Sequence, residues 1–272
     1  MYVYVYTHAH VCIHLYVYRG VYIVNVISVI NQKGGVGKST TALALGSGLF
    51  ARGFKVLFVD MDAQGNLTYA LGADNGGLTV FDVLTGASKA ARAMQNTKHG
   101  ALLTSSPALS GSDTVLTQTG KEYCLKEALD ALSSDFDYVI IDTPPALGIL
   151  TINALTASAG VIIPAQADIF SLQGITQLYG TLEAVLKYCN PALKVMGILL
   201  TRYQSRSIIS REVAEMIEES AKALDTKLYN AKIRENTAIK EAQARRSSIF
   251  DYAPKSNAAA DYNDLLDEIL GV

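Results

Sequence analysis

Residues 31–40, which read NQKGGVGKST, form a glycine-rich turn that carries two lysines. Glycines let the backbone curl so that several N–H groups point at one anion, and a lysine followed by a hydroxyl residue can bind phosphate oxygens and Mg²⁺. The usual nucleotide loop begins with a glycine five positions before its last glycine, yet position 32 is Gln. Lys33 instead places a second positive charge beside Lys38. The run therefore predicts a phosphate site of an unusual, two-lysine type.

Each position of the loop has an expected part in nucleotide binding. Lys38 is predicted to reach the β- and γ-phosphates of ATP, and the Ser39 hydroxyl is predicted to ligate Mg²⁺. Lys33 and Lys38 together would neutralise charge that builds up during phosphoryl transfer. A glycine-rich turn with two chance lysines is the alternative, which the order of strand, loop and helix disfavours. The predicted ATP-binding residues are Lys33, Gly34, Gly35, Val36, Gly37, Lys38, Ser39 and Thr40.

Two carboxylate positions follow apolar runs that are typical of buried strands. Residues 137–142 end in Asp142, and residues 55–60 end in Asp60, with Asp62 two positions later. Ligands of open α/β sheets bind at the carboxyl ends of strands, so Asp142 is expected to hold a Mg²⁺-bound water. Asp62 is predicted to orient or deprotonate the attacking water, with Asp60 supporting it. The alternatives are a helix-capping role for Asp142 and a merely polar turn after Asp60.

The rest of the chain alternates short apolar runs with helical patterns, which indicates a parallel sheet wrapped by helices. Residues 72–121, rich in Gly, Ser and Thr, give no clear pattern. The predicted fold class is α/β, a mostly parallel twisted sheet with helices on both faces, as in the P-loop NTPase fold. Predicted strands cover residues 26–30, 55–60, 137–142, 160–164 and 195–201. Predicted helices cover residues 40–51, 123–132, 171–188, 208–224 and 258–270.

Composition is that of a globular chain with one sizeable domain. There are 272 residues, a net charge of −2 and three widely spaced cysteines, which argue against a disulfide framework and favour a reducing cytoplasm. The sequence contains no run of about 18 apolar residues, so no membrane span is predicted. Residues 1–24 alternate Tyr, Val and His, and we interpret them as a low-complexity tail that is either non-native or disordered. Residues 25–272 are predicted to form a single ATPase domain.

Four motifs, in this order, resemble the ParA/Soj partition ATPases, which belong to the deviant Walker-type P-loop ATPases. The similarity extends from about residue 26 to residue 270. The motifs are KGGVGKST at 33–40, DMDAQGN at 60–66, DTPPALG at 142–148 and PAQADIFSLQG at 164–174.

The resemblance implies a DNA partition cycle. Binding of ATP and Mg²⁺ would drive a sandwich homodimer in which Lys33 reaches the partner's phosphates, and Asp62 would be needed for hydrolysis. The ATP-bound dimer would bind double-stranded DNA without sequence preference. A ParB-like centromere-binding protein would stimulate hydrolysis and reset the cycle. The protein would be cytoplasmic and nucleoid-associated, with no membrane partner.

A basic stretch in the carboxyl-terminal half is the predicted DNA surface. Residues 194–246 hold eleven Lys and Arg against seven Asp and Glu, in a chain whose net charge is −2. Arg206 lies where the family carries a DNA-contacting arginine before a helix, whereas Ala238 occupies the position of the family's other arginine. A solvated helix face is the alternative. The predicted DNA-binding residues are Arg206, Lys240, Arg245 and Arg246.

A MinD-like, membrane-associated positioning ATPase is the alternative function. It would need a C-terminal amphipathic helix with a basic rim, whereas residues 261–272 are amphipathic but acidic. We expect that segment to pack on the protein core. An iron–sulfur reductase would need cysteines in two glycine-rich loops, and Cys124 and Cys189 lie in helical patterns instead.

Overall fold

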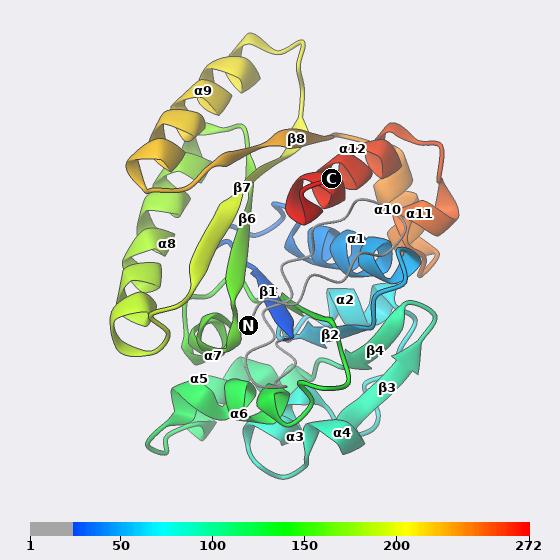
Figure 1. Ribbon diagram of the computed structural model, residues 1–272, viewed down its shortest axis with the longest axis vertical. Helices are drawn as coiled ribbons and strands as arrows, with labels where there is room; N and C mark the ends of the chain where they lie inside the picture. Colours follow the sequence, from blue (N-terminus) through cyan, green and yellow to red (C-terminus); the bar gives the residue numbers. More distant parts are fainter. Residues whose placement is uncertain (1–23) are drawn as a thin grey trace, which may run out of the picture.

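Residues 24–272 are described by a computed structural model, in which a central sheet is covered by helices on both faces (Figure 1). The low-complexity tail, apart from Val24, lies outside these residues. The α/β architecture predicted from the alternation of strands and helices is confirmed.

The sheet of the described residues has eight strands in the order β3-β4-β2-β5-β1-β6-β7-β8. Neighbouring strands are parallel, except that β3 and β4 form an antiparallel hairpin at one edge. Parallel strands end at a common edge, so the segments after β1, β2 and β5 come together there. The strands are β1 (Asn25–Val29), β2 (Val56–Asp60), β3 (Met94–Thr97), β4 (Gly100–Leu103), β5 (Tyr138–Asp142), β6 (Gly160–Gln166), β7 (Lys194–Tyr203) and β8 (Leu228–Arg234).

The helices divide between the two faces of the sheet. On one face α1 and α2 share a core with the C-terminal helices α10 to α12, and α3 to α9 cover the other face. Figure 1 shows α12 and α10 gathered around α1. The helices are α1 (Lys38–Ala51), α2 (Asn66–Ala70), α3 (Val80–Leu84), α4 (Ala90–Ala93), α5 (Ser112–Val115), α6 (Cys124–Asp130), α7 (Ile149–Ala157), α8 (Ile169–Tyr188), α9 (Ile208–Ala223), α10 (Thr237–Ala244), α11 (Ile249–Tyr252) and α12 (Asn257–Leu270).

Central strands are buried on both sides, which explains their continuous apolar runs. Phe58 of β2 faces the core under α1, while its neighbours Leu57 and Val59 face the opposite core, and all three are fully buried. Successive side chains of a strand point to opposite faces, so a strand covered on both faces must be apolar at every position.

Every predicted strand and helix is present, with ends displaced by at most two residues. The region 72–121 folds into short helices and the β3–β4 hairpin, because helices of four or five residues are too short to show a helical period. The elements α7, β8, α10 and α11 had no prediction either. In α7 the side chains are buried nearly all round, so the helix has no polar face.

The C-terminal helix α12 packs on the core, as expected from its sequence. Tyr262, Leu265 and Leu266 of α12 are buried in the cluster that includes α1. Within residues 24–272 no helix combines the length and apolar character needed to span a membrane.

Close packing between α1 and β2 leads to a stability prediction at Gly46. A Cβ added there would overlap the Phe58 ring. Gly46→Ala should therefore lower the free energy of unfolding by about 1–3 kcal/mol, although Ala favours helix. Urea denaturation of the two proteins would measure this difference.

The matched control is Gly180→Ala in α8, where an added Cβ would meet no atom within 4 Å. This change should raise stability by about 0.5–1 kcal/mol, because only helix propensity changes. If both substitutions stabilise the protein, the packing of α1 on β2 is looser than described.

Candidate nucleotide site

The glycine-rich loop lies between the end of β1 and the start of α1. Gly35 and Gly37 have φ of 74° and 92°, a left-handed conformation in which residues with a side chain are strained. Gly37 directly precedes α1, so free N–H groups of the first helical turn face the loop. This backbone geometry suits an anion such as a phosphate group.

Three hydrogen bonds tie the loop to the neighbouring strands β6 and β7. Asn31 Nδ2 donates to a carbonyl of β6 at 2.7 Å, and Gln166 Nε2 donates to the carbonyl of Gly35 at 3.1 Å. Thr201 Oγ1 of β7 donates to the carbonyl of Val36 at 2.7 Å. The loop is therefore shaped by the fold before any ligand arrives.

Lys38, the first residue of α1, has a buried side chain. Its Nζ donates to the Lys33 carbonyl at 3.2 Å, so the ammonium is held inside the loop. Burial lowers the pKa of Lys38, and the charges of Asp142 and Asp62 oppose that shift. The positive charge thus lies near two carboxylates at the ends of different strands.

Asp142, the last residue of β5, is fully buried, and neither carboxylate oxygen has a hydrogen-bond partner among the described residues. Burial raises its pKa well above the usual value, and the neighbouring Asp60 adds to the shift. The Ser39 hydroxyl and Lys38 lie close enough to oppose the shift. A buried carboxylate without partners is costly unless a cation or a bound water satisfies it. The donor set of Asp142 and Ser39 therefore fits Mg²⁺ and its water ligands.

Asp60 and Asp62 have different surroundings, although they are only two residues apart. Asp60 accepts hydrogen bonds from the N–H and the hydroxyl of Thr68, both at 2.7 Å, and burial raises its pKa to about 6. It also accepts from the N–H of Asp62 at 3.2 Å, so its role is to hold α2 and the following loop. Asp62 Oδ1 accepts from the N–H of Gln64 at 3.0 Å, which leaves Oδ2 available for a water.

Lys33 pairs with Asp168 in this structure, at 2.6 Å between Nζ and Oδ2. Asp168 caps the N-terminus of α8 by accepting from the N–H of Ser171. Partial burial would raise the pKa of Asp168, but Lys33 and Ser171 outweigh it and the pKa is lowered. Asp168 is not among the predicted site residues, although an Asp directly before an apolar helical pattern is an N-cap signal.

The predicted DNA-binding residues lie outside the nucleotide loop, on exposed positions after β7 and β8. Arg206 lies in the loop between β7 and α9, Lys240 lies on α10, and Arg245 follows α10. Arg246 stacks on the ring of Tyr69 of α2, at 4.4 Å from its centroid. Other members of the basic stretch are engaged in ion pairs, namely Lys222 with Glu218, Lys227 with Glu268 and Arg234 with Asp261.

A parallel sheet with a two-lysine loop after β1, and carboxylates at the ends of β2 and β5, defines a P-loop ATPase. The sequence profile of the AAA domain family matches residues 24–195. The chain is 39% identical over 249 residues to the sporulation initiation inhibitor protein Soj of Bacillus subtilis, covering 90% of this chain and 97% of Soj. It is 37% identical over 252 residues to the chromosome partitioning protein ParA of Caulobacter vibrioides, covering 90% and 93%. The chain belongs to this family, that of the ParA and Soj ATPases.

Solved structures share the fold and include nucleotide complexes. Cobyrinic acid a,c-diamide synthase from Mycobacterium smegmatis with bound ADP and magnesium is 36% identical, with a TM-score of 0.78, covering 91% of this chain and 94% of that chain. An ATP complex of a Cyanothece McdA variant is 25% identical, with a TM-score of 0.81 and coverage of 92% and 97%. These similar chains thus bind adenine nucleotides, in one case together with magnesium.

The buried carboxylate of Asp142 leads to a pH-dependent prediction. The pKa of Asp142 is higher in the folded protein than in the unfolded protein, so ionisation of this group destabilises the folded state. The free energy of unfolding therefore falls from about pH 4 upward and stops falling above the raised pKa. Asp142→Asn should therefore raise the Tm of the nucleotide-free protein at pH 7.5 and change it little near pH 4. Scanning calorimetry at both pH values would measure this.

In the presence of ATP and Mg²⁺ the order should reverse, because Asn lacks the negative charge with which Asp142 would hold a metal-bound water. The wild type should gain Tm on addition of both cofactors, and Asp142→Asn should gain much less. Equal gains in the two proteins would show that Asp142 has no part in binding the metal.

Proposed function

We propose that this chain is an ATP-dependent DNA partition ATPase that works as a nucleotide-switched dimer. The similarity to Soj and ParA along 90% of the chain carries the proposal, since both motifs and fold are shared. A further relative, 36% identical over 244 residues, is the chromosome-partitioning ATPase Soj of Treponema pallidum. The protein would act in the cytoplasm and on the nucleoid.

Each side chain of the site has a task that its position permits. The loop amides and Lys38 would bind the phosphates and neutralise the charge that develops on the transferred phosphoryl group. Asp142 and Ser39 would hold Mg²⁺, which would neutralise part of the phosphate charge. Asp62 would orient the attacking water through the carboxylate oxygen that the Gln64 amide leaves free. Asp60 would keep that loop in place through Thr68.

Lys33 would act on the nucleotide of a second copy. In the structure it pairs with Asp168 beside the exposed Phe170, whose ring centroid lies 6.0 Å from Nζ. The pair is about one-third exposed, so it is worth little and can be exchanged for a phosphate. A homodimer formed with ATP would supply that phosphate, and the exposed side chains at the start of α8 would be covered by the same event.

Double-stranded DNA would bind the ATP-bound dimer without sequence preference through Arg206, Lys240, Arg245 and Arg246. These exposed cations are free of ion pairs in the described part of the chain and can reach phosphate oxygens. A ParB-like centromere-binding protein would stimulate hydrolysis and release the protein from DNA.

DNA binding with ATP, with ADP and without nucleotide is the direct test of the proposed switch. Fluorescence anisotropy of a labelled duplex of random sequence should show tight binding by the wild type with ATP only. Lys38→Ala should abolish the difference, because its ammonium binds the phosphates. Wild-type binding that is the same in all three conditions would overturn the nucleotide switch, and vesicle binding with ATP would favour a MinD-like function instead.

Arg206 should contribute one phosphate contact to this binding. Arg206→Ala is expected to weaken DNA affinity and to reduce the slope of log K against log salt by about 0.9. Arg92→Ala is the matched control, because Arg92 is an exposed arginine of α4 that lies outside the basic stretch 194–246. Unchanged affinity and slope for Arg206→Ala, or equal losses for both variants, would remove Arg206 from the DNA surface.

A further inference from the structure

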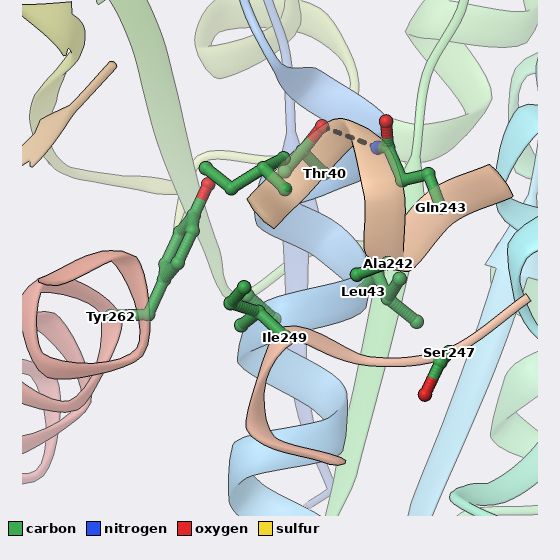
Figure 2. Close-up of a pocket in the computed structure, with 9 residues that line it drawn as sticks. Thr40, Leu43, Ala242, Gln243, Ser247, Ile249 and Tyr262 are labelled. Carbon is green, nitrogen blue, oxygen red and sulfur yellow. Dashed lines mark hydrogen bonds between the residues drawn. The ribbon is translucent and has the colours of Figure 1, made fainter. Parts of the chain in front are cut away.

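The short helix α10 lies directly on the first turn of α1, the helix that begins at the nucleotide loop. Gln243 Nε2 of α10 donates a hydrogen bond of 2.7 Å to Thr40 Oγ1, across 203 positions of sequence. Figure 2 shows the Gln243 side chain reaching Thr40. Ala242 of α10 is buried in the same core cluster as Leu43 and Ala44 of α1. α10 therefore cannot shift without disturbing the start of α1.

The direction of this hydrogen bond decides what Thr40 can offer to a nucleotide. A hydroxyl has one proton to donate and two acceptor positions. Because Gln243 occupies an acceptor position of Thr40, the hydroxyl proton is left free to donate to a phosphate oxygen. Thr40 lies in the helical turn whose amides face the loop, where such an oxygen would be bound.

A second contact joins the end of α10 to the other side of the nucleotide site. Arg246 has a left-handed backbone, with φ of 52°, and its guanidinium stacks on Tyr69 of α2. α2 is in turn held to Asp60 through Thr68. The segment from Gln243 to Arg246 thus contacts both the helix of the phosphate loop and the helix that follows the Asp62 loop.

Open space beside the second contact allows that segment to move. An open surface hollow adjoins Arg246 and Tyr69 and is lined also by Gln64, Gly65 and Asp74. The α1 side of the segment is tightly packed, whereas the α2 side has room. A change at Thr40 would therefore tilt α10 about its contact with α1. The tilt would move the exposed cations Lys240 and Arg245.

We propose that Gln243 is a positioning residue that couples the nucleotide site to the cationic surface of α10. It would hold Thr40 ready to donate to phosphate and would transmit the presence of that phosphate to Lys240 and Arg245. The predicted effect on DNA affinity rests on the proposed function. The predicted response of α10 to the nucleotide does not depend on DNA binding.

Gln243→Met tests the coupling, because Met keeps the length and bulk of Gln but cannot donate a hydrogen bond. The ratio of DNA affinities with ATP and with ADP should fall about fivefold, the value of one ordinary hydrogen bond. Hydrogen exchange of residues 237–244 should respond to ATP and Mg²⁺ in the wild type and respond much less in Gln243→Met. Both proteins should still bind ATP, as measured by calorimetry.

Two controls separate coupling from DNA contact and from general effects of substitution. Lys240→Ala should lower DNA affinity with ATP, and with it the affinity ratio, but should leave the hydrogen-exchange response of residues 237–244 to ATP and Mg²⁺ as in the wild type. Gln177→Met changes an exposed glutamine of α8 that makes no side-chain hydrogen bond among the described residues, and it should behave as wild type.

A wild-type affinity ratio and a wild-type exchange response in Gln243→Met would overturn the coupling. A second outcome is that wild-type DNA affinity is the same with and without nucleotide while the hydrogen-exchange response of α10 still depends on Gln243. That result would contradict the proposed role in DNA partition and support the coupling. If the exchange of residues 237–244 does not respond to nucleotide even in the wild type, the coupling is wrong.

Discussion

The buried carboxylate of Asp142, without a hydrogen-bond partner in the described structure, is the constraint on which the site depends. Transfer of a charge from water to the protein interior is costly, and one buried lysine nearby does not remove the cost, because that lysine is itself desolvated. Lys38 and Asp142 shift their pKa values toward the neutral forms for the same reason, which is burial. A cation with its bound waters satisfies both oxygens at once. The buried carboxylate of Asp142 is thus the physical reason why we propose that Mg²⁺ would be held at this edge of the sheet.

The hydrophobic core holds the charged groups of Lys38 and Asp142 in buried positions that would be unfavourable for either group by itself. β1, β2 and β5 are adjacent in the sheet and buried on both faces, so their ends cannot move apart to relieve the charges. Asn31 and Thr201 fasten the phosphate loop to β6 and β7 by hydrogen bonds of 2.7 Å. Packing energy of the whole sheet therefore preorganises the loop and the carboxylates.

The carboxyl-terminal part of the chain is built into the nucleotide site as well. Tyr262 of α12 is fully buried against α1, with its hydroxyl 3.3 Å from that of Thr41. Gln243 reaches Thr40 from α10, one position earlier along α1. Two adjacent threonines of the phosphate-loop helix are thus held by helices that follow the last strand. This arrangement would allow a bound nucleotide to influence a surface that is formed late in the chain.

The sequence by itself determined the phosphate loop, the strand-end aspartates and the order of the main elements. These features are local, because a glycine turn before a helix and an apolar run that ends in Asp are each encoded within about ten residues. It did not reveal α7 or the short helices of residues 72–121, which lack a polar face or a full period. Only the tertiary structure decided that Lys33 pairs with Asp168, that Arg234 is engaged by Asp261 and that Gln243 reaches Thr40. These partners lie 135, 27 and 203 positions apart, and such pairing is set by how the sheet brings helices together, which no local pattern records.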